Sequence, residues 1–127
     1  MGDMRTPLGR VRGLGSAKSG TEHFWRIRLT ALALAPLSLF VIGWVLSLRG
    51  SSLEEIRASI AHPFVALVLA LFLIAALDHM RLGMQIIIED YAHNEANKLV
   101  LLILNTFFTI AVGVLSIFAL LKLTFGG

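Results

Sequence analysis

Three ionisable side chains stand close together inside a long apolar stretch of the chain: Asp78, His79 and Arg81. Ionisable groups are costly inside a membrane helix and by default mark a functional site there. If residues 63–88 form a helix, Asp78 and Arg81 are three positions apart and can neutralise each other. We interpret them as a structural ion pair or as a contact to a partner protein.

His79 lies on a different face of the same helix, which it shares with Gly83 one turn further on. The glycine has no side chain to block a flat ligand lying against the helix. An imidazole at membrane depth beside such a space is suited to axial ligation of a haem iron. A neutral histidine that hydrogen-bonds to a neighbouring helix explains the same spacing. The pattern alone leaves both interpretations open.

Asp90 and Tyr91 follow at the far end of this helix, roughly 16–18 Å along the axis from His79. Antiparallel packing predicts that they reach the level of Arg28, at the start of the first apolar segment. A phenol, a carboxylate and a guanidinium at one membrane surface could hydrogen-bond a quinone carbonyl and relay its protons. An ordinary interfacial belt also contains tyrosine and arginine. The remaining histidines are expected in connectors, exposed to solvent: His23, His62 and His93.

The elements that must position these side chains follow from composition. The 127 residues are 57% hydrophobic and only 15% charged, too little polar surface for a soluble domain of this size. Residues 29–48 and 99–121 contain no charge, and residues 63–88 form a third apolar stretch. Each is long enough to cross a hydrocarbon core of roughly 30 Å as a helix, the conformation that satisfies the backbone there. The sequence predicts an all-α membrane protein with three antiparallel transmembrane helices. The expected spans are 27–48, 63–89 and 98–123.

The segment before the first span is basic and rich in glycine. Residues 1–20 are expected to be irregular, and residues 1–24 to form an arm on the cytoplasmic side by the positive-inside rule. The three-helix anchor then occupies residues 25–125. Because the positive charge gathers at this one place beside the membrane, the net charge of +3 does not indicate a nucleic-acid partner.

Local signals refine the connectors. Ser52 and Glu55 have the spacing of a capping box, which predicts a short helix on the outer membrane surface. Pro63 suits the first turn of the second span, and Pro36 falls inside the first span, where a kink is tolerated. The chain has no cysteine, which excludes disulfides, thiolate-bound iron–sulfur clusters and covalent haem attachment through paired cysteines.

Several motifs together resemble the hydrophobic membrane anchor subunit of succinate dehydrogenase, the smaller, D-type anchor of succinate:quinone oxidoreductases. The likeness covers about residues 15 to 125, including the number and order of spans. One combination is specific: a histidine is followed by a glycine four residues later and by Asp-Tyr eleven and twelve residues later. The segments that carry the resemblance are Ser19-Gly20-Thr21-Glu22-His23-Phe24-Trp25, Arg28-Leu29-Thr30-Ala31, His79-Met80-Arg81-Leu82-Gly83-Met84-Gln85 and Asp90-Tyr91-Ala92-His93.

The resemblance implies roles for five residues. His79 would be an axial ligand of haem b, packed beside Gly83, with the second histidine supplied by a C-type cytochrome b anchor subunit that completes the bundle. Tyr91 would hydrogen-bond ubiquinone, with Asp90 nearby. Arg28 would lie near the haem propionates and the quinone. The chain would have no catalytic centre of its own.

The resemblance also implies partners and a location. A flavoprotein and an iron–sulfur subunit would dock on the cytoplasmic or matrix face of a bacterial or mitochondrial inner membrane, and electrons from the tricarboxylic acid cycle would pass to ubiquinone. The alternatives are an anchor of a fumarate reductase, a purely structural anchor, and a small proton-relay or transport protein using Asp78, His79 and Arg81. Three helices without an inverted repeat argue against a transporter acting alone.

Overall fold

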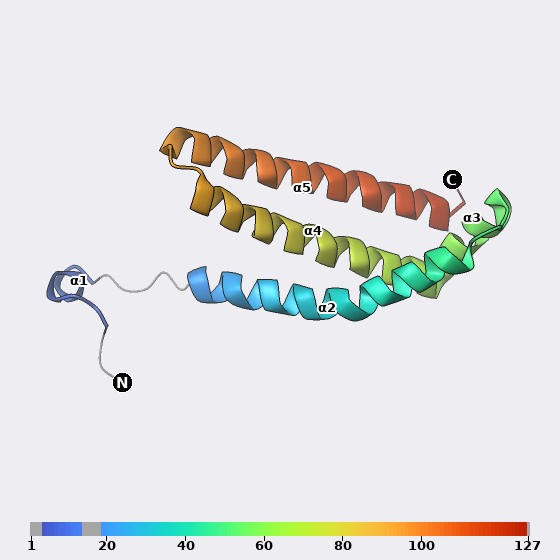
Figure 1. Cartoon of the computed structure of the whole chain (residues 1–127), viewed down its shortest axis with the longest axis horizontal. Helices are drawn as coiled ribbons and strands as arrows, with labels where there is room; N and C mark the ends of the chain where they lie inside the picture. Colours follow the sequence, from blue (N-terminus) through green and yellow to red (C-terminus); the bar gives the residue numbers. More distant parts are fainter. Residues whose placement is uncertain (1–3, 14–18, 127) are drawn as a thin grey trace.

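The computed structural model describes residues 4–13 and 19–126 of the chain. All regular secondary structure in this part is helical. The helices are α1 (Pro7–Val11), α2 (Ser19–Ser47), α3 (Leu53–Ala61), α4 (Pro63–Tyr91) and α5 (Glu95–Thr124) (Figure 1). Helices α2, α4 and α5 are long and apolar enough to cross a membrane. The prediction of an all-α membrane protein with three spanning helices is confirmed.

Helix α4 is the central element of the fold. It packs against α2 on one side and α5 on the other, whereas α2 and α5 do not contact each other within the described residues. The three long helices therefore form an open layer, with neighbours antiparallel (Figure 1). Among the described residues the buried apolar side chains are few: Val68, Leu82 and Ile88 of α4 and Leu120 of α5. Such a thin core leaves broad apolar faces for lipid or for other chains.

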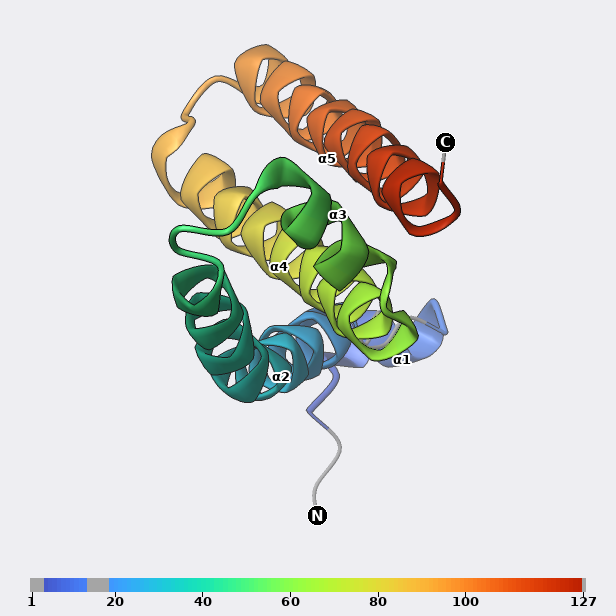
Figure 2. The same cartoon turned by 90° about the vertical axis from the view of Figure 1, so that its right-hand side faces the viewer.

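The capping signals of the second connector are confirmed. The Ser52 backbone N–H donates to Glu55 Oε2 at 2.6 Å, and the Glu55 N–H donates to Ser52 Oγ at 3.2 Å, which starts α3. The pKa of the Glu55 carboxyl is lowered, because hydrogen bonds from Ser52 stabilise the charged carboxylate. The bond from the Ser52 backbone N–H has the larger effect, and the bond from the Ser52 hydroxyl has the smaller one. Pro63 stands in the first turn of α4, as expected. Helix α3 lies across the ends of α4 and α5 (Figure 2).

Two features of the N-terminal half differ from expectation. Within residues 1–20, predicted to be irregular, Pro7–Val11 form α1, because the Thr6 hydroxyl accepts a hydrogen bond from the Gly9 N–H and Pro7 suits the first helical turn. Helix α2 already begins at Ser19, inside the predicted arm. It contains Pro36 and bends between its two halves (Figure 2), in keeping with the missing N–H donor of a proline.

Candidate functional site

The carboxylate of Asp78, in the second half of α4, is held by two guanidinium groups. Arg26 of α2 places Nη2 at 2.7 Å from Asp78 Oδ1, and Arg81 of α4 places Nη2 at 3.4 Å from the same oxygen. The predicted pairing of Asp78 with Arg81 is confirmed, but it is the longer of the two contacts. The shorter one ties α2 to α4.

Arg26 was not predicted as a partner of Asp78. The spacing within one helix predicts only local pairs, whereas the Arg26–Asp78 pair joins residues 52 positions apart. One feature of the sequence could have indicated this pair. Arg26 is a second basic residue near the start of the first span, and that span was expected to run antiparallel to the helix that carries Asp78. An ion pair at this place helps to set the register between α2 and α4, because moving either helix by one turn would separate the charges.

His79 points from α4 toward α2 and contacts Thr30. Its Nδ1 lies 3.0 Å from the Thr30 Oγ1. The same hydroxyl donates to backbone carbonyl oxygens of its own helix, at 2.8 Å from Arg26 O and 3.0 Å from Ile27 O. A hydroxyl has only one hydrogen, which Thr30 can give either to a backbone carbonyl or to Nδ1; when a carbonyl receives it, Oγ1 accepts a hydrogen bond from an Nδ1–H.

The tautomer of His79 determines which of these two arrangements forms. A neutral imidazole that carries its hydrogen on Nδ1 keeps a lone pair on Nε2. Within the described residues, Nε2 makes no hydrogen bond, and it is not enclosed by the chain. The expected hydrogen bond between His79 and a neighbouring helix is therefore present. It uses Nδ1 and leaves Nε2 available as a ligand.

Gly83 stands beside open space. A Cβ built on it would meet no heavy atom within 4 Å. Gly113 of α5 provides a contrast, since a Cβ there would lie 3.3 Å from Leu77 Cδ1 of α4. Gly113 thus serves close packing between α4 and α5, whereas packing within the described chain does not require a glycine at position 83. The space one turn beyond His79 is open to a group from outside.

Arg28 does not share a level with Asp90 and Tyr91, contrary to expectation. The Thr30–His79 contact places Arg28 within about 3 Å of the level of His79 along the helix axis, while Asp90 lies about 16 Å further along α4. The difference arises because α2 continues as a helix back to Ser19, and this end of α2 lies beside the C-terminal end of α4 (Figure 1).

The surroundings of these residues are simple. The Arg28 guanidinium carbon stands 5.0 Å from the centroid of the Phe24 ring, a cation–π contact. Tyr91 ends α4 with 76% of its surface exposed. Arg28, Asp90 and Tyr91 share no hydrogen bond or ion pair among the residues whose structure is described. A site that used Tyr91 together with a cation would draw that cation from elsewhere.

One of the three remaining histidines does not lie in a connector. His23 lies within α2, and its Nε2 is buried without a hydrogen-bond partner in the described structure. His62 caps α4, accepting at Nδ1 from the Phe64 N–H at 3.2 Å. His93 is exposed, as expected. His62 is also exposed in the connector between α3 and α4, as expected. The expectation for His23 was wrong because the expected span boundary omitted the N-terminal extension of α2.

Comparison with known proteins identifies a family. The family model for succinate dehydrogenase/fumarate reductase transmembrane subunits matches residues 2–114. The succinate dehydrogenase hydrophobic membrane anchor subunit of Paracoccus denitrificans is 35% identical over 121 residues, which cover 95% of this chain and 93% of that protein. The subunit of the same name in Rickettsia bellii is 35% identical over 97 residues, 76% of each chain. The succinate dehydrogenase membrane anchor subunit of Reclinomonas americana is 31% identical over 86 residues, 65% of this chain and 72% of that one. No solved structure matches the chain.

Proposed function

Because the chain belongs to the succinate dehydrogenase/fumarate reductase transmembrane subunit family, we propose that it anchors a succinate:ubiquinone oxidoreductase and supplies one axial ligand of haem b through His79. Its relatives are non-catalytic membrane anchor subunits of succinate dehydrogenase, and this chain has the same role as an anchor. The family and the three spanning helices support the anchor function.

The contact of His79 with Thr30 is the observation that carries the haem proposal. Iron binds the nitrogen of a neutral imidazole that has no hydrogen, and a ligating histidine commonly donates its other N–H to a nearby oxygen. Thr30 supplies that oxygen at 3.0 Å, which orients the ring and leaves Nε2 for the metal. The open space beside Gly83 is suited to the edge or face of a porphyrin.

The chemistry of the donor set also fits haem. A porphyrin supplies four ligands of its own, so each chain needs to contribute only one side chain. The described part of the chain contains no group of three or more His, Cys, Asp or Glu side chains that could hold a bare metal ion. The second axial histidine would come from the C-type cytochrome b anchor subunit. When bound, the haem supplies one-electron transfer, while the protein supplies orientation and electrostatics.

Arg28 is proposed for the haem propionates. Arg28 lies near the level of His79 along the helix axis, on the face of α2 away from Thr30, and it makes no ion pair in the described structure. Its separation from Tyr91 along the helix axis, more than 10 Å by helical rise, argues against one site that contains both residues. We therefore assign Arg28 to the haem side and not to the quinone.

Tyr91 and Asp90 are proposed as this chain's part of the ubiquinone site. The exposed Tyr91 phenol can donate a hydrogen bond to a quinone carbonyl, and the neighbouring Asp90 carboxylate can pass protons from water. Both residues lie at the membrane face where α2 begins, the face that we assign to the cytoplasm or matrix. The iron–sulfur and flavoprotein subunits would dock there, at a bacterial or mitochondrial inner membrane.

A proton-relay or transport protein is less consistent with the site. Asp78 is engaged by two guanidinium groups and shares no hydrogen bond with His79 in the described structure. These side chains therefore do not form a continuous series of proton donors and acceptors. An anchor of a fumarate reductase stays an alternative, because the family description includes both enzymes.

Purification of the tagged chain from native membranes tests the assembly. We expect it to copurify with a second anchor subunit, an iron–sulfur protein and a flavoprotein, and to carry a b-type haem band in its reduced-minus-oxidised spectrum. Copurification without haem would retain the anchor function and refute the haem site. Purification without those subunits would refute both.

A further inference from the structure

A narrow apolar groove runs along one side of the α4–α5 pair, in the half of the bundle that ends at Tyr91. It has a volume of about 280 Å³. No residue of α2 lines this groove, and α2 and α5 do not contact each other within the described residues. The groove is therefore open toward lipid or toward another molecule. Its apolar walls are formed by Met80, Met84 and Ile88 of α4 and by Leu101, Leu104 and Phe108 of α5.

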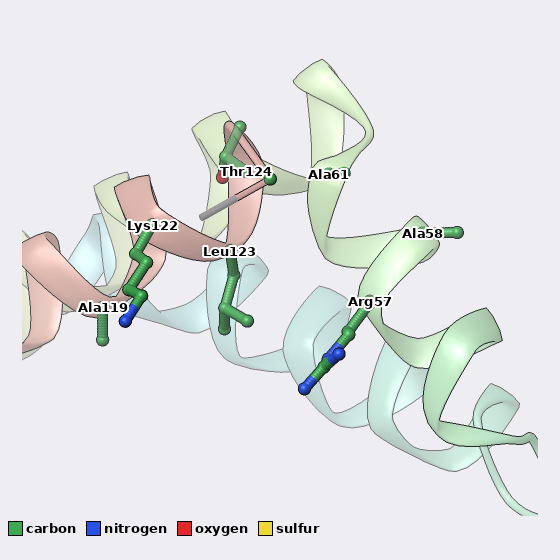
Figure 3. Close-up of a pocket in the computed structure, with 8 residues that line it drawn as sticks. Arg57, Ala58, Ala61, Ala119, Lys122, Leu123 and Thr124 are labelled. Atoms are coloured by element: carbon green, nitrogen blue, oxygen red, sulfur yellow. The ribbon is translucent and has the colours of Figure 1, made fainter.

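The lining of this groove is almost entirely apolar, and no charged side chain contributes to it. Its polar residue is Asn105, whose Nδ2 donates to the Arg81 carbonyl oxygen at 3.0 Å and thereby joins α5 to α4. The pocket between α3 and α5 at the opposite membrane face is different, because Arg57 and Lys122 line it (Figure 3). An apolar chain placed against those two cations would remove water from them at a cost, whereas the groove is suited to such a chain.

Tyr91 stands just beyond the groove, on the face of α4 that lines it. It follows Met84 by seven residues and Met80 by eleven, and both steps return to within about 20° of the same direction round a helix. A helical side chain covers the turn before its own Cα, which for Tyr91 is the turn that carries Ile88. From Tyr91 to Met80 the path is roughly 16 Å long, about half of a hydrocarbon core of roughly 30 Å.

The groove and the proposed haem space lie on different faces of α4. Met84 directly follows Gly83, and one residue corresponds to about 100° round a helix. A haem beside His79 and Gly83 therefore does not need the space between α4 and α5.

We propose that the groove holds the isoprenoid tail of the quinone, an inference that rests on the quinone site proposed at Tyr91. The ring and the tail of one molecule would then lie in line along α4. Methionine side chains are flexible and fill irregular spaces, so they suit a chain with branching methyl groups. A transmembrane helix is about 10 Å across and too wide for a space of this volume. A phospholipid acyl chain would fit, but it carries no quinone ring for Tyr91.

The groove would orient the tail and, through it, the ring. A lipid bilayer is as apolar as the groove, so the tail gains packing contacts and a fixed direction there, not hydrophobic free energy. We therefore expect a moderate effect on quinone reduction that depends on the tail.

Steady-state quinone reduction by the purified complex tests this, with ubiquinone that carries two isoprene units and with the same ring without a tail. Leu104→Trp adds bulk to the wall of the groove. It should lower kcat/KM for the tailed quinone about fivefold, the effect of overfilling a packed site, and leave the tail-free quinone unaffected. Ile103→Trp is the matched control, because Ile103 is the neighbouring, comparably exposed residue of α5 and does not line the groove. No selective loss in Leu104→Trp, or an equal loss in Ile103→Trp, would overturn the proposal.

A photoreactive quinone locates the tail directly. A ubiquinone with a diazirine near the ring end of its tail should label Met84 and Leu101, and excess ubiquinone should prevent this labelling. Labelling confined to a partner subunit would contradict the proposed position of the tail. Labelling that excess ubiquinone does not reduce would mean that the groove holds lipid chains, which also contradicts it.

Failure of the quinone site and failure of the tail groove give different results. If Tyr91 does not contact the quinone, Tyr91→Phe leaves the reduction of both quinones unchanged. If Tyr91 contacts the ring and the tail lies elsewhere, Tyr91→Phe slows the reduction of both quinones, while Leu104→Trp does not distinguish between them. The haem spectrum and the thermal stability check that each variant is folded.

Discussion

The Thr30 hydroxyl lies 3.0 Å from Nδ1 of His79, and when it gives its one hydrogen to its own backbone, it accepts a hydrogen bond from the ring. In that arrangement Nε2 is the ring nitrogen that carries no hydrogen. Neither residue is unusual alone. Under the proposed haem assignment, the contact between them would orient the histidine as a ligand.

Thr30→Val should weaken haem binding without unfolding the protein. Valine has a similar shape but cannot accept the Nδ1 hydrogen, and losing such an outer-shell partner typically costs 10–100-fold in metal affinity. Thr30→Ser should retain most of the affinity, because it keeps the hydroxyl. The measurement is haem content per complex after extensive washing, with the haem reduction potential as a second readout. Equal haem content and potential in the valine and serine variants would show that Thr30 has no influence on the ligand.

Gly83→Leu should exclude the haem but leave the chain folded. The structure offers free space for a side chain at this position, and glycine is a poor helix former, so the helix itself should tolerate the change. Gly113→Leu is the contrasting variant, because its Cβ alone would approach Leu77 to 3.3 Å. We expect loss of the haem band with normal thermal stability in the first variant, and reduced stability in the second. Full haem content in Gly83→Leu would place the porphyrin elsewhere.

Tyr91→Phe should slow quinone reduction and leave the haem spectrum unchanged. The ring remains while one donor to the quinone carbonyl is lost, and a hydrogen bond of about 1 kcal/mol corresponds to roughly a fivefold to tenfold loss in kcat/KM. Succinate oxidation with a water-soluble electron acceptor should be unaffected, since it bypasses this site. Unchanged quinone kinetics would mean that Tyr91 is an ordinary aromatic residue of the membrane interface and does not contact the quinone.

The Arg26–Asp78 contact should be stronger than the Arg81–Asp78 contact. The first is shorter and joins two helices, whereas the second lies within one turn of α4. Double-mutant cycles with Arg26→Gln, Arg81→Gln and Asp78→Asn should give a coupling of about 1 kcal/mol for the first pair and less for the second. Thermal unfolding of the intact complex supplies the measurement. A larger coupling for Arg81 would mean that the ion pair is mainly local.

The sequence predicted the parts of this fold that depend on local chemistry. Two charge-free stretches and a third, mostly apolar one predicted the three membrane helices, and Ser52 with Glu55 predicted the start of α3. Contacts between helices were not predictable in the same way, because they depend on register and rotation. Arg26 and Thr30 were therefore missed as partners of Asp78 and His79.

The position of Arg28 shows the same limit. Hydropathy placed the first span near residue 27, and Arg28 was expected at the membrane surface beside Asp90. Helix α2 begins at Ser19, however, and the contact of Thr30 with His79 places Arg28 deeper along the bundle. Hydropathy detects where lipid begins, but a helix can continue beyond that boundary, so the start of a helix and the start of a span need not coincide.

The reduced-minus-oxidised spectrum of the purified complex with His79→Leu tests the central claim most directly. His93→Leu is the matched control, because His93 is exposed beyond the end of α4. The His79 variant should assemble with its partner subunits yet lose or strongly weaken the b-type band, while the His93 variant keeps it. An unchanged band in an assembled His79→Leu complex would contradict the assignment of this residue as a haem ligand.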